Sequence, residues 1–287
     1  MNRQDMREGL SHTNRCLYCD TPFYEEISWR WAFGLTDNQL LCPPCQNKLE
    51  SITTIGCSMC GRPSVEKTMG KTGGSDPSGS DPPEIGYVDP SVRLPNTFIK
   101  HPDVLCLDCE RWKDTGIWAD HPLQHRALYV YNAHLQEVIA RYKYRGDAKL
   151  SELFSGKLKK LTRSLGKIDT VTVIPLQEER LWERGFNQAE LLAERFPVQH
   201  VLERTSSSDK QSKRDRSGRI AALKGAFSLS TAARQTDWQD KRVLIVDDIY
   251  TTGATLRAAA EVFYTEGASH VFAVTVARAT GKMKREP

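Results

Sequence analysis

The chain has 287 residues and a formal net charge of +4, so its length allows one large domain or two ordinary ones, and its net charge favours no class of partner. It contains no apolar run close to the roughly 18 residues that cross a bilayer. The polar segment at 1–15 lacks the apolar centre of a secretory signal. We therefore expect a protein without a membrane span that stays in the cytoplasm.

All eight cysteines occur in four Cys-x-x-Cys pairs, and none lies after residue 109. This spacing lets one turn of backbone present two sulfurs to a tetrahedral ion, and two pairs complete its coordination. A reducing compartment disfavours disulfides, redox pairs seldom come in fours, and the spacing differs from that of ferredoxins. The sequence therefore predicts two structural Zn²⁺ sites. Their ligands are Cys16, Cys19, Cys42, Cys45, Cys57, Cys60, Cys106 and Cys109.

The spacing leaves two ways of sharing the pairs between the ions. Sequential pairing closes shorter loops than an interleaved cross-brace and costs less entropy, so we favour it. Closed Cys₄ sites have no open ligand position, and we expect them to serve folding and docking. The aromatic residues Trp29, Trp31 and Phe33 between the first two pairs are expected to form the small core of the ribbon.

A segment rich in Gly, Ser and Pro separates the third cysteine pair from the fourth. Because it has few apolar residues, it is expected to be a flexible insertion without a core of its own. We therefore predict a double zinc-ribbon domain at 1–115, with this insertion at about 66–97, followed by a second domain at 120–287.

Downstream of the last cysteine, helical and strand patterns alternate. Asn132 is placed to cap the first helix, and Gly146 to end it. The apolar periodicity predicts strands at 171–174, 243–246 and 271–276, and helices at 132–146, 150–162, 188–196 and 253–266. Apolar strands that alternate with helices indicate a parallel sheet covered on both faces, which is an α/β fold. In such sheets, ligands bind beyond the carboxyl ends of the strands.

The strand predicted at 243–246 leads directly into two aspartates and then a loop rich in threonine. That loop opens a helix, whose free N–H groups and dipole attract phosphate. Gly253 allows close approach of the backbone. The carboxylates are acceptors, so they suit the two hydroxyls of a ribose or a metal-bound diphosphate. A sugar with a phosphate at one end and a vicinal diol nearby satisfies both halves of the motif.

This motif resembles the binding site for phosphoribosyl pyrophosphate (PRPP) in type I phosphoribosyltransferases. The resemblance implies that Asp247 and Asp248 hold the ribose hydroxyls and that Mg²⁺ accompanies the diphosphate. It assigns the phosphate to Thr251, Thr252, Gly253, Ala254 and Thr255. The alternative is a Walker B strand, but its partner, a Walker A loop, is not found.

The resemblance narrows when the cysteine ribbon, KYRGD at 143–147 and RGFNQ at 184–188 are added. Together these segments are similar to the ComF family of late competence proteins, from Cys16 to about Arg278. Membership would imply a role in natural transformation, in which DNA is brought into the cell. It does not identify an acceptor for phosphoribosyl transfer.

Two basic segments stand out in this nearly neutral chain. Residues 126–163 hold nine Lys/Arg against three Asp/Glu, and residues 204–224 hold seven against two. They suggest a polyanion or an anionic substrate, and the alternative is a solvated surface. The candidates for single-stranded DNA are Lys143, Arg145, Lys149, Lys157, Lys159 and Lys160.

Catalytic candidates follow from the need to neutralise a leaving pyrophosphate. Arg184 is one, and Asn187 beside it is expected to cap the next helix. The polar segment at 204–219 occupies the place of a flexible hood in the resembled enzymes, and ordinary exposed surface is the alternative. Its candidates are Arg204, Lys210, Gln211 and Arg219.

Two functions from different classes remain open. One is a phosphoribosyltransferase that acts on an unknown acceptor. The other is a non-catalytic module that retains the fold and binds single-stranded DNA or a component of the DNA-uptake machinery. The two are compatible, because a pocket that holds PRPP phosphate can also hold the phosphate of a nucleotide.

Overall fold

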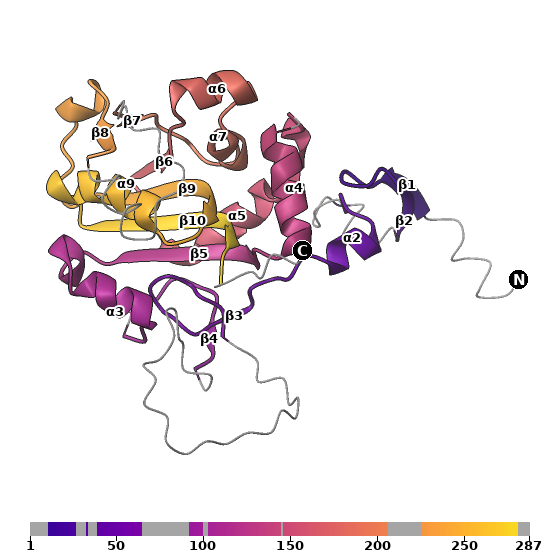
Figure 1. Cartoon of the computed structure of the whole chain (residues 1–287), viewed down its shortest axis with the longest axis horizontal. Coiled ribbons are helices and arrows are strands. Elements are labelled where there is room, and N and C mark those ends of the chain that lie inside the picture. The colour runs from indigo at the N-terminus through magenta and orange to yellow at the C-terminus, as the bar shows by residue number, and fades with distance from the viewer. Residues whose placement is uncertain are drawn as a thin grey trace, which may run out of the picture.

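The computed structural model describes residues 11–26, 33, 39–64, 92–99, 103–144, 146–205 and 225–280. Its centre is a four-stranded sheet in the order β5-β10-β9-β6, in which every neighbouring pair is parallel (Figure 1). The strands are β5 (Leu123–Val130), β10 (His270–Arg278), β9 (Arg242–Tyr250) and β6 (Thr170–Val173). The expected parallel α/β sheet is confirmed, and β5 is a strand that the sequence analysis did not find.

Both faces of the sheet are buried, as expected for parallel strands. Successive side chains of a strand point to opposite faces. On β9, Leu244 and Val246 therefore join one apolar cluster, and Val243 and Ile245 join another. The first cluster includes α4 (Ala133–Tyr144), α5 (Ser155–Leu161) and α7 (Gln188–Leu192), whereas the second includes α9 (Ala254–Thr265).

The helix at the start of the α/β part begins as the sequence predicts. The Leu135 N–H donates to Asn132 Oδ1 at 2.9 Å, which caps α4, and Gly146 has a φ of +68°. The single helix expected at 150–162 is wrong. It is replaced by η2 (Ala148–Leu153), α5 and η3 (Thr162–Leu165), because the backbone at the buried Phe154 leaves the helical region with a φ of −122°.

A small antiparallel pair joins β7 (Leu202–Arg204) to β8 (Phe227–Leu229), and the sequence analysis did not predict it. The pair brackets residues 206–224, so Lys210, Gln211 and Arg219 lie outside the described residues. Three further short helices are α3 (Leu107–Lys113), η1 (Gly116–Ala119) and η4 (Ala233–Gln235). The loop after β6 leads into α6 (Glu178–Arg184), whose side chains are not buried.

The cysteine-rich part contains two small antiparallel pairs. In the first, β1 (Ser11–Arg15) pairs with β2 (Pro22–Glu26), and α2 (Pro43–Asn47) follows beside α4 (Figure 1). In the second, β3 (Thr54–Ile55) pairs with β4 (Leu94–Pro95) below the β5 edge of the sheet (Figure 1). The expected insertion at 66–97 is therefore too long at its end, and residues 65–91 lie outside the described part.

The cysteine-rich part packs against the central sheet. Asn96 Nδ2 donates to Ile52 O at 2.8 Å and to Ala127 O at 2.9 Å, which ties the second pair to β5. The two cysteine groups belong to the apolar clusters on opposite faces of the sheet. The domain limits at 1–115 and 120–287 stay a prediction. In the part of the chain that the structure describes, no helix is both long and apolar enough for a bilayer.

Candidate functional site

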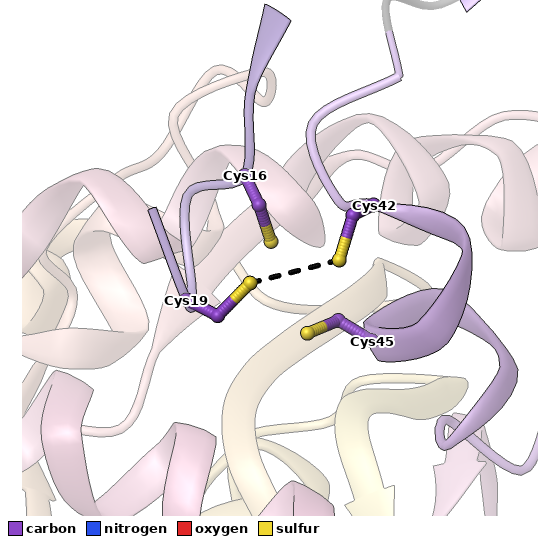
Figure 2. A group of neighbouring side chains, drawn as sticks. All are labelled: Cys16, Cys19, Cys42 and Cys45. Atoms are coloured by element: carbon purple, nitrogen blue, oxygen red, sulfur yellow. Dashed lines mark hydrogen bonds between the residues drawn. The ribbon is translucent and has the colours of Figure 1, made fainter. Parts of the chain in front are cut away.

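The first cysteine group gathers around one point. The turn between β1 and β2 supplies Cys16 and Cys19, whereas Cys42 and Cys45 come from the start of α2, and all four side chains point toward one another (Figure 2). Their sulfurs lie within 4.8 Å of one another, and Cys19 and Cys42 are 3.6 Å apart. None of the four is in a disulfide.

The second group has the same construction and is more deeply buried. Cys57 and Cys60 follow β3, and Cys106 and Cys109 begin α3. These four residues are at most 1% exposed, and the Cys60 and Cys106 sulfurs are 3.7 Å apart. Four sulfurs at about 2.3 Å from one tetrahedral zinc would be about 3.8 Å apart, so both groups fit one ion each.

Sequential pairing of the cysteines is therefore confirmed. Each group could hold a metal ion, and the assignment to zinc stays a prediction from the four-thiolate donor set. The expected aromatic core of the ribbon is wrong for Phe33, which is 73% exposed. Trp29 and Trp31 lie outside the described residues.

The two aspartates do not follow the end of their strand, as the sequence analysis expected, but are part of it. β9 continues to Tyr250, while its pairing with β6 ends at Val246. Along a strand, adjacent residues face opposite sides. Asp248 forms an ion pair with Lys143 of α4, and the charge of Arg204 acts on Asp247. The charge of Lys143 also acts on Asp247, ahead of that of Arg204, so the two carboxylates share the Lys143 cation at the open carboxyl edge of the sheet.

The charges at this edge favour a ligand that stabilises the ionised carboxylates. Burial, and next to it the charge of Asp248, raises the pKa of Asp247 to about 7. Burial lowers the pKa of Arg204, so the nearby cation is itself held away from water. A ribose hydroxyl donating to Asp247, or a divalent cation beside it, would stabilise the ionised carboxylate.

The loop after β9 has the shape that close approach of an anion requires. Gly253 is buried, has a φ of +79° and caps the 12-residue helix α9. The Ala254 N–H donates to Thr252 Oγ1 at 3.3 Å. The exposed Thr251 and the half-buried Thr252 and Thr255 place hydroxyls around the helix start. The structure therefore places this loop, and the start of the helix after it, where the sequence predicts them.

The segment RGFNQ braces the loop that follows β6. Asn187 caps α7 by accepting from the Ala189 N–H at 3.0 Å, as predicted, and its Nδ2 donates to Ile174 O at 3.1 Å. Arg184 Nη1 donates to Gln188 Oε1 at 2.8 Å, and its guanidinium lies over the Tyr144 ring. Arg184 thus lies beside the end of α4, and its contact with an anion stays a prediction.

The six DNA-binding candidates do not form one surface. The ion pair with Asp248 places Lys143 in the carboxylate site. Lys149 and Lys159 are exposed, and Lys159 lies over the Phe196 ring. Lys157 and Lys160 line a separate groove, described below. Arg145 lies outside the described residues.

Three buried residues behind the loop at 251–253 were missed by the sequence analysis, namely Tyr250, Arg257 and Arg278. Arg257 Nη1 donates to Tyr250 Oη at 2.8 Å, and Arg278 Nη1 donates to Thr251 O at 3.1 Å. Each arginine interrupts or ends an otherwise apolar element, α9 or β10. That pattern is the signal that could have drawn attention to them.

Comparison with known proteins gives consistent similarities. The family described as phosphoribosyl transferase domain matches residues 181–286. Competence protein ComFC of Bacillus subtilis (strain 168) is 32% identical over 276 residues, which cover 94% of this chain and 97% of that protein. ComFC of Streptococcus pneumoniae is 32% identical over 64% of this chain and 80% of its own length. DNA utilization protein YhgH of Escherichia coli (strain K12) is 32% identical over 38% of this chain and 49% of its own length.

Proposed function

Because the chain belongs to the ComFC family of competence proteins, we propose that it takes part in the uptake and handling of DNA and that it binds PRPP at the carboxyl edge of its sheet. The PRPP assignment rests on the order of groups along β9 and the loop that follows it. Asp247 and Asp248 lie on the strand, and Gly253 then caps α9, where the backbone N–H groups are free for a phosphate.

Each part of this edge suits one part of PRPP. The first turn of α9 and the hydroxyls of Thr251, Thr252 and Thr255 would bind the 5-phosphate. Asp247 and Asp248 would accept from the ribose hydroxyls, and Mg²⁺ would accompany the diphosphate. Binding would displace the Lys143 ammonium from Asp248, so the ion pair in the ligand-free protein competes with the sugar.

The chemistry that this site supports is phosphoribosyl transfer to an acceptor that is still to be identified. The bond from C1 of the ribose to pyrophosphate breaks with its electron pair on the leaving oxygen, and the acceptor forms a new bond to C1. The sugar passes through a cationic state, which nearby carboxylates stabilise. Arg184 and Arg204, with Lys210, Gln211 and Arg219 as further candidates, would neutralise the pyrophosphate.

A double substitution tests the PRPP assignment. Asp247→Asn with Asp248→Asn removes both acceptor charges with little change in volume, and titration calorimetry with PRPP and Mg²⁺ should show that binding is lost. The control is Asp120→Asn with Asp237→Asn, which makes the same change of charge at exposed positions. Unchanged affinity in the first variant would refute the assignment.

A second assay separates an enzyme from a binding module. The protein is incubated with PRPP and Mg²⁺, with and without single-stranded DNA, and released pyrophosphate is measured. Release that depends on an added acceptor supports the transferase. PRPP binding without release, combined with DNA binding, supports the non-catalytic alternative, which could also bind a component of the uptake machinery.

For the DNA-binding part of the proposal, a basic groove offers specific support. It has a volume of about 810 Å³ and runs between α5 and the segments around Thr53 and Asn96. Lys157, Lys160 and Arg163 line one side. Lys157 Nζ donates to Tyr129 Oη at 2.8 Å, so its charge is held at the wall. A positively charged groove of this kind suits the backbone of single-stranded DNA.

Charge reversal tests this groove. Lys160→Glu with Arg163→Glu should weaken binding of a labelled single-stranded oligonucleotide, measured by fluorescence anisotropy. It should also lower the slope of log affinity against log salt by about 0.7 for each lost phosphate contact. Arg111→Glu with Lys113→Glu is the control at exposed positions that do not line the groove. Equal losses in both variants would contradict a DNA site in the groove.

A further inference from the structure

Three arginines are buried in the centre of the molecule. Arg126, Arg257 and Arg278 are at most 2% exposed. Among the described residues, no carboxylate forms an ion pair with any of these three arginines. Removing a charged side chain from water costs several kcal/mol unless an opposite charge or hydrogen bonds compensate for it. A group other than a paired carboxylate must therefore compensate for the charge of these arginines.

The second cysteine group is the neighbour that these arginines share. Arg278 Nη2 lies 3.5 Å from Cys60 Sγ, and its Nε donates to Cys60 O at 3.4 Å. Arg126 Nη2 donates to Ser58 O at 2.9 Å, and Ser58 lies between Cys57 and Cys60 in the chain. Arg257 lies over the ring of Trp112, 4.5 Å from its centre, on the helix that carries Cys109.

A metal centre at this position has the charge that the arginines lack. Four thiolates around one divalent cation carry a net charge of −2, because four negative charges meet two positive ones. The fit is geometric as well, since the four sulfurs are buried within 4.8 Å of one another.

Two of the same arginines also hold the loop that precedes α9. Arg278 Nη1 donates to Thr251 O at 3.1 Å, and the guanidinium lies 4.3 Å from the centre of the Tyr250 ring. Arg257 Nη1 donates to Tyr250 Oη, and a Cβ at Gly253 would lie 2.5 Å from Arg257 Nη1. One guanidinium, that of Arg278, therefore contacts a cysteine sulfur on one side and the loop on the other.

We propose that the metal centre of Cys57, Cys60, Cys106 and Cys109 supplies the counter-charge that keeps Arg257 and Arg278 in place, so that its occupancy controls the order of the loop at 251–253. Arg278 is the positioning residue of this link. The inference concerns the loop itself, and it rests on the proposed function only where it extends to PRPP affinity. The first cysteine group contacts α4 instead, where Tyr18 Oη donates to Glu137 at 2.9 Å.

Hydrogen exchange of the backbone amides at 250–257, followed by mass spectrometry, measures the order of the loop. Arg278→Gln keeps all eight cysteines, and should retain both metal ions while the amides exchange at least tenfold faster. Arg278→Lys keeps the charge but not the two-sided contact, and should restore part of the protection. Arg195→Gln, at an exposed position, is the matched control and should leave the exchange unchanged. Unchanged exchange in Arg278→Gln would overturn the proposal.

A pair of cysteine variants tests the role of the metal. Cys106→Ser should lose one ion by elemental analysis and expose the amides at 250–257, whereas Cys19→Ser should lose the other ion and leave them protected. If Cys106→Ser does not fold, removal of metal from the wild-type protein by a chelator, followed in time by exchange and metal content, gives the same comparison. Loss of the second ion with full protection of the loop would refute the coupling.

The affinity for PRPP is measured on the same variants. Arg278→Gln should lower it at least tenfold, although Arg278 is not among the residues assigned to the ligand. Should the wild-type protein fail to bind PRPP while the exchange data behave as expected, the proposed function fails and the coupling stands. Should PRPP bind with equal affinity to Arg278→Gln and wild type, the extension of the coupling to the ligand is wrong.

Discussion

Substitution of Gly253 by alanine adds one methyl group, which tests the packing behind the loop at 251–253. The φ of +79° at Gly253 lies in the left-handed region, where a side chain costs about 1–2 kcal/mol. A Cβ there would also lie 2.2 Å from Tyr250 Oη and 2.5 Å from Arg257 Nη1, and contacts under 3.0 Å force a displacement. Both atoms belong to one buried hydrogen bond of 2.8 Å.

Gly253→Ala should therefore cost more than its backbone conformation alone. Loss of a hydrogen bond to a charged group adds about 1.5–3 kcal/mol, so we expect a decrease of about 2.5–5 kcal/mol in the free energy of unfolding. The matched control is Gly185→Ala. Gly185 has a similar φ of +76° with nothing within 4 Å of the added Cβ, so only the backbone cost of about 1–2 kcal/mol applies.

Urea unfolding, followed by tryptophan fluorescence and circular dichroism, measures both variants. The difference between them isolates the steric contribution, because the backbone cost is common to both. Equal destabilisation would show that Tyr250 and Arg257 move aside without loss, and would refute the account of a rigid support behind the loop. The Gly253 variant should also lose PRPP affinity, whereas the Gly185 variant should retain most of it.

Three further predictions concern charge, capping and metal. Asp247 has a pKa of about 7 in the folded protein and about 4 when unfolded, so the native state binds the extra proton. Stability should then fall as pH rises from about 4 to about 7, by up to about 4 kcal/mol, and Asp247→Asn should remove this dependence; a variant whose urea unfolding keeps the wild-type pH profile would contradict it. Asn187→Ala removes both the cap of α7 and the bond to Ile174 O, and should cost about 1–3 kcal/mol, compared by thermal unfolding with Asn187→Asp, which keeps the cap. Elemental analysis of the purified protein should find two zinc ions per chain, and one ion, or iron, would contradict the assignment of the cysteine groups.

Much of the fold was readable from local patterns. The pairing of the cysteines follows from loop entropy, which favours ions that join neighbouring pairs. The helix start at Asn132, the cap at Asn187 and the loop at Gly253 depend on backbone groups a few residues away. Such features are written in adjacent residues, so the sequence can predict them before any long-range contact is known.

Other features depend on contacts between distant residues. The sequence suggested that the aspartates lie beyond a strand, but pairing with β10 continues β9 as far as Tyr250. Lys143 looked like part of a DNA-binding surface, yet α4 packs so that its ammonium reaches Asp248, 105 residues away. The strand β5, which the sequence analysis did not find, and the split of the helix at Phe154 likewise follow from burial against the sheet.

By itself, the sequence determined the four cysteine pairs that could hold metal ions, the alternation of helices and strands, and the loop that suits a sugar phosphate, because each is encoded by residues close together in the chain. Only the tertiary structure decided which charges meet. Arg278 and Cys60 are 218 residues apart and in contact, since β10 lies in the interior of the sheet and the second cysteine group packs against its end. Electrostatic energy depends on distance in space and on exclusion of water, and neither can be read from position in the sequence.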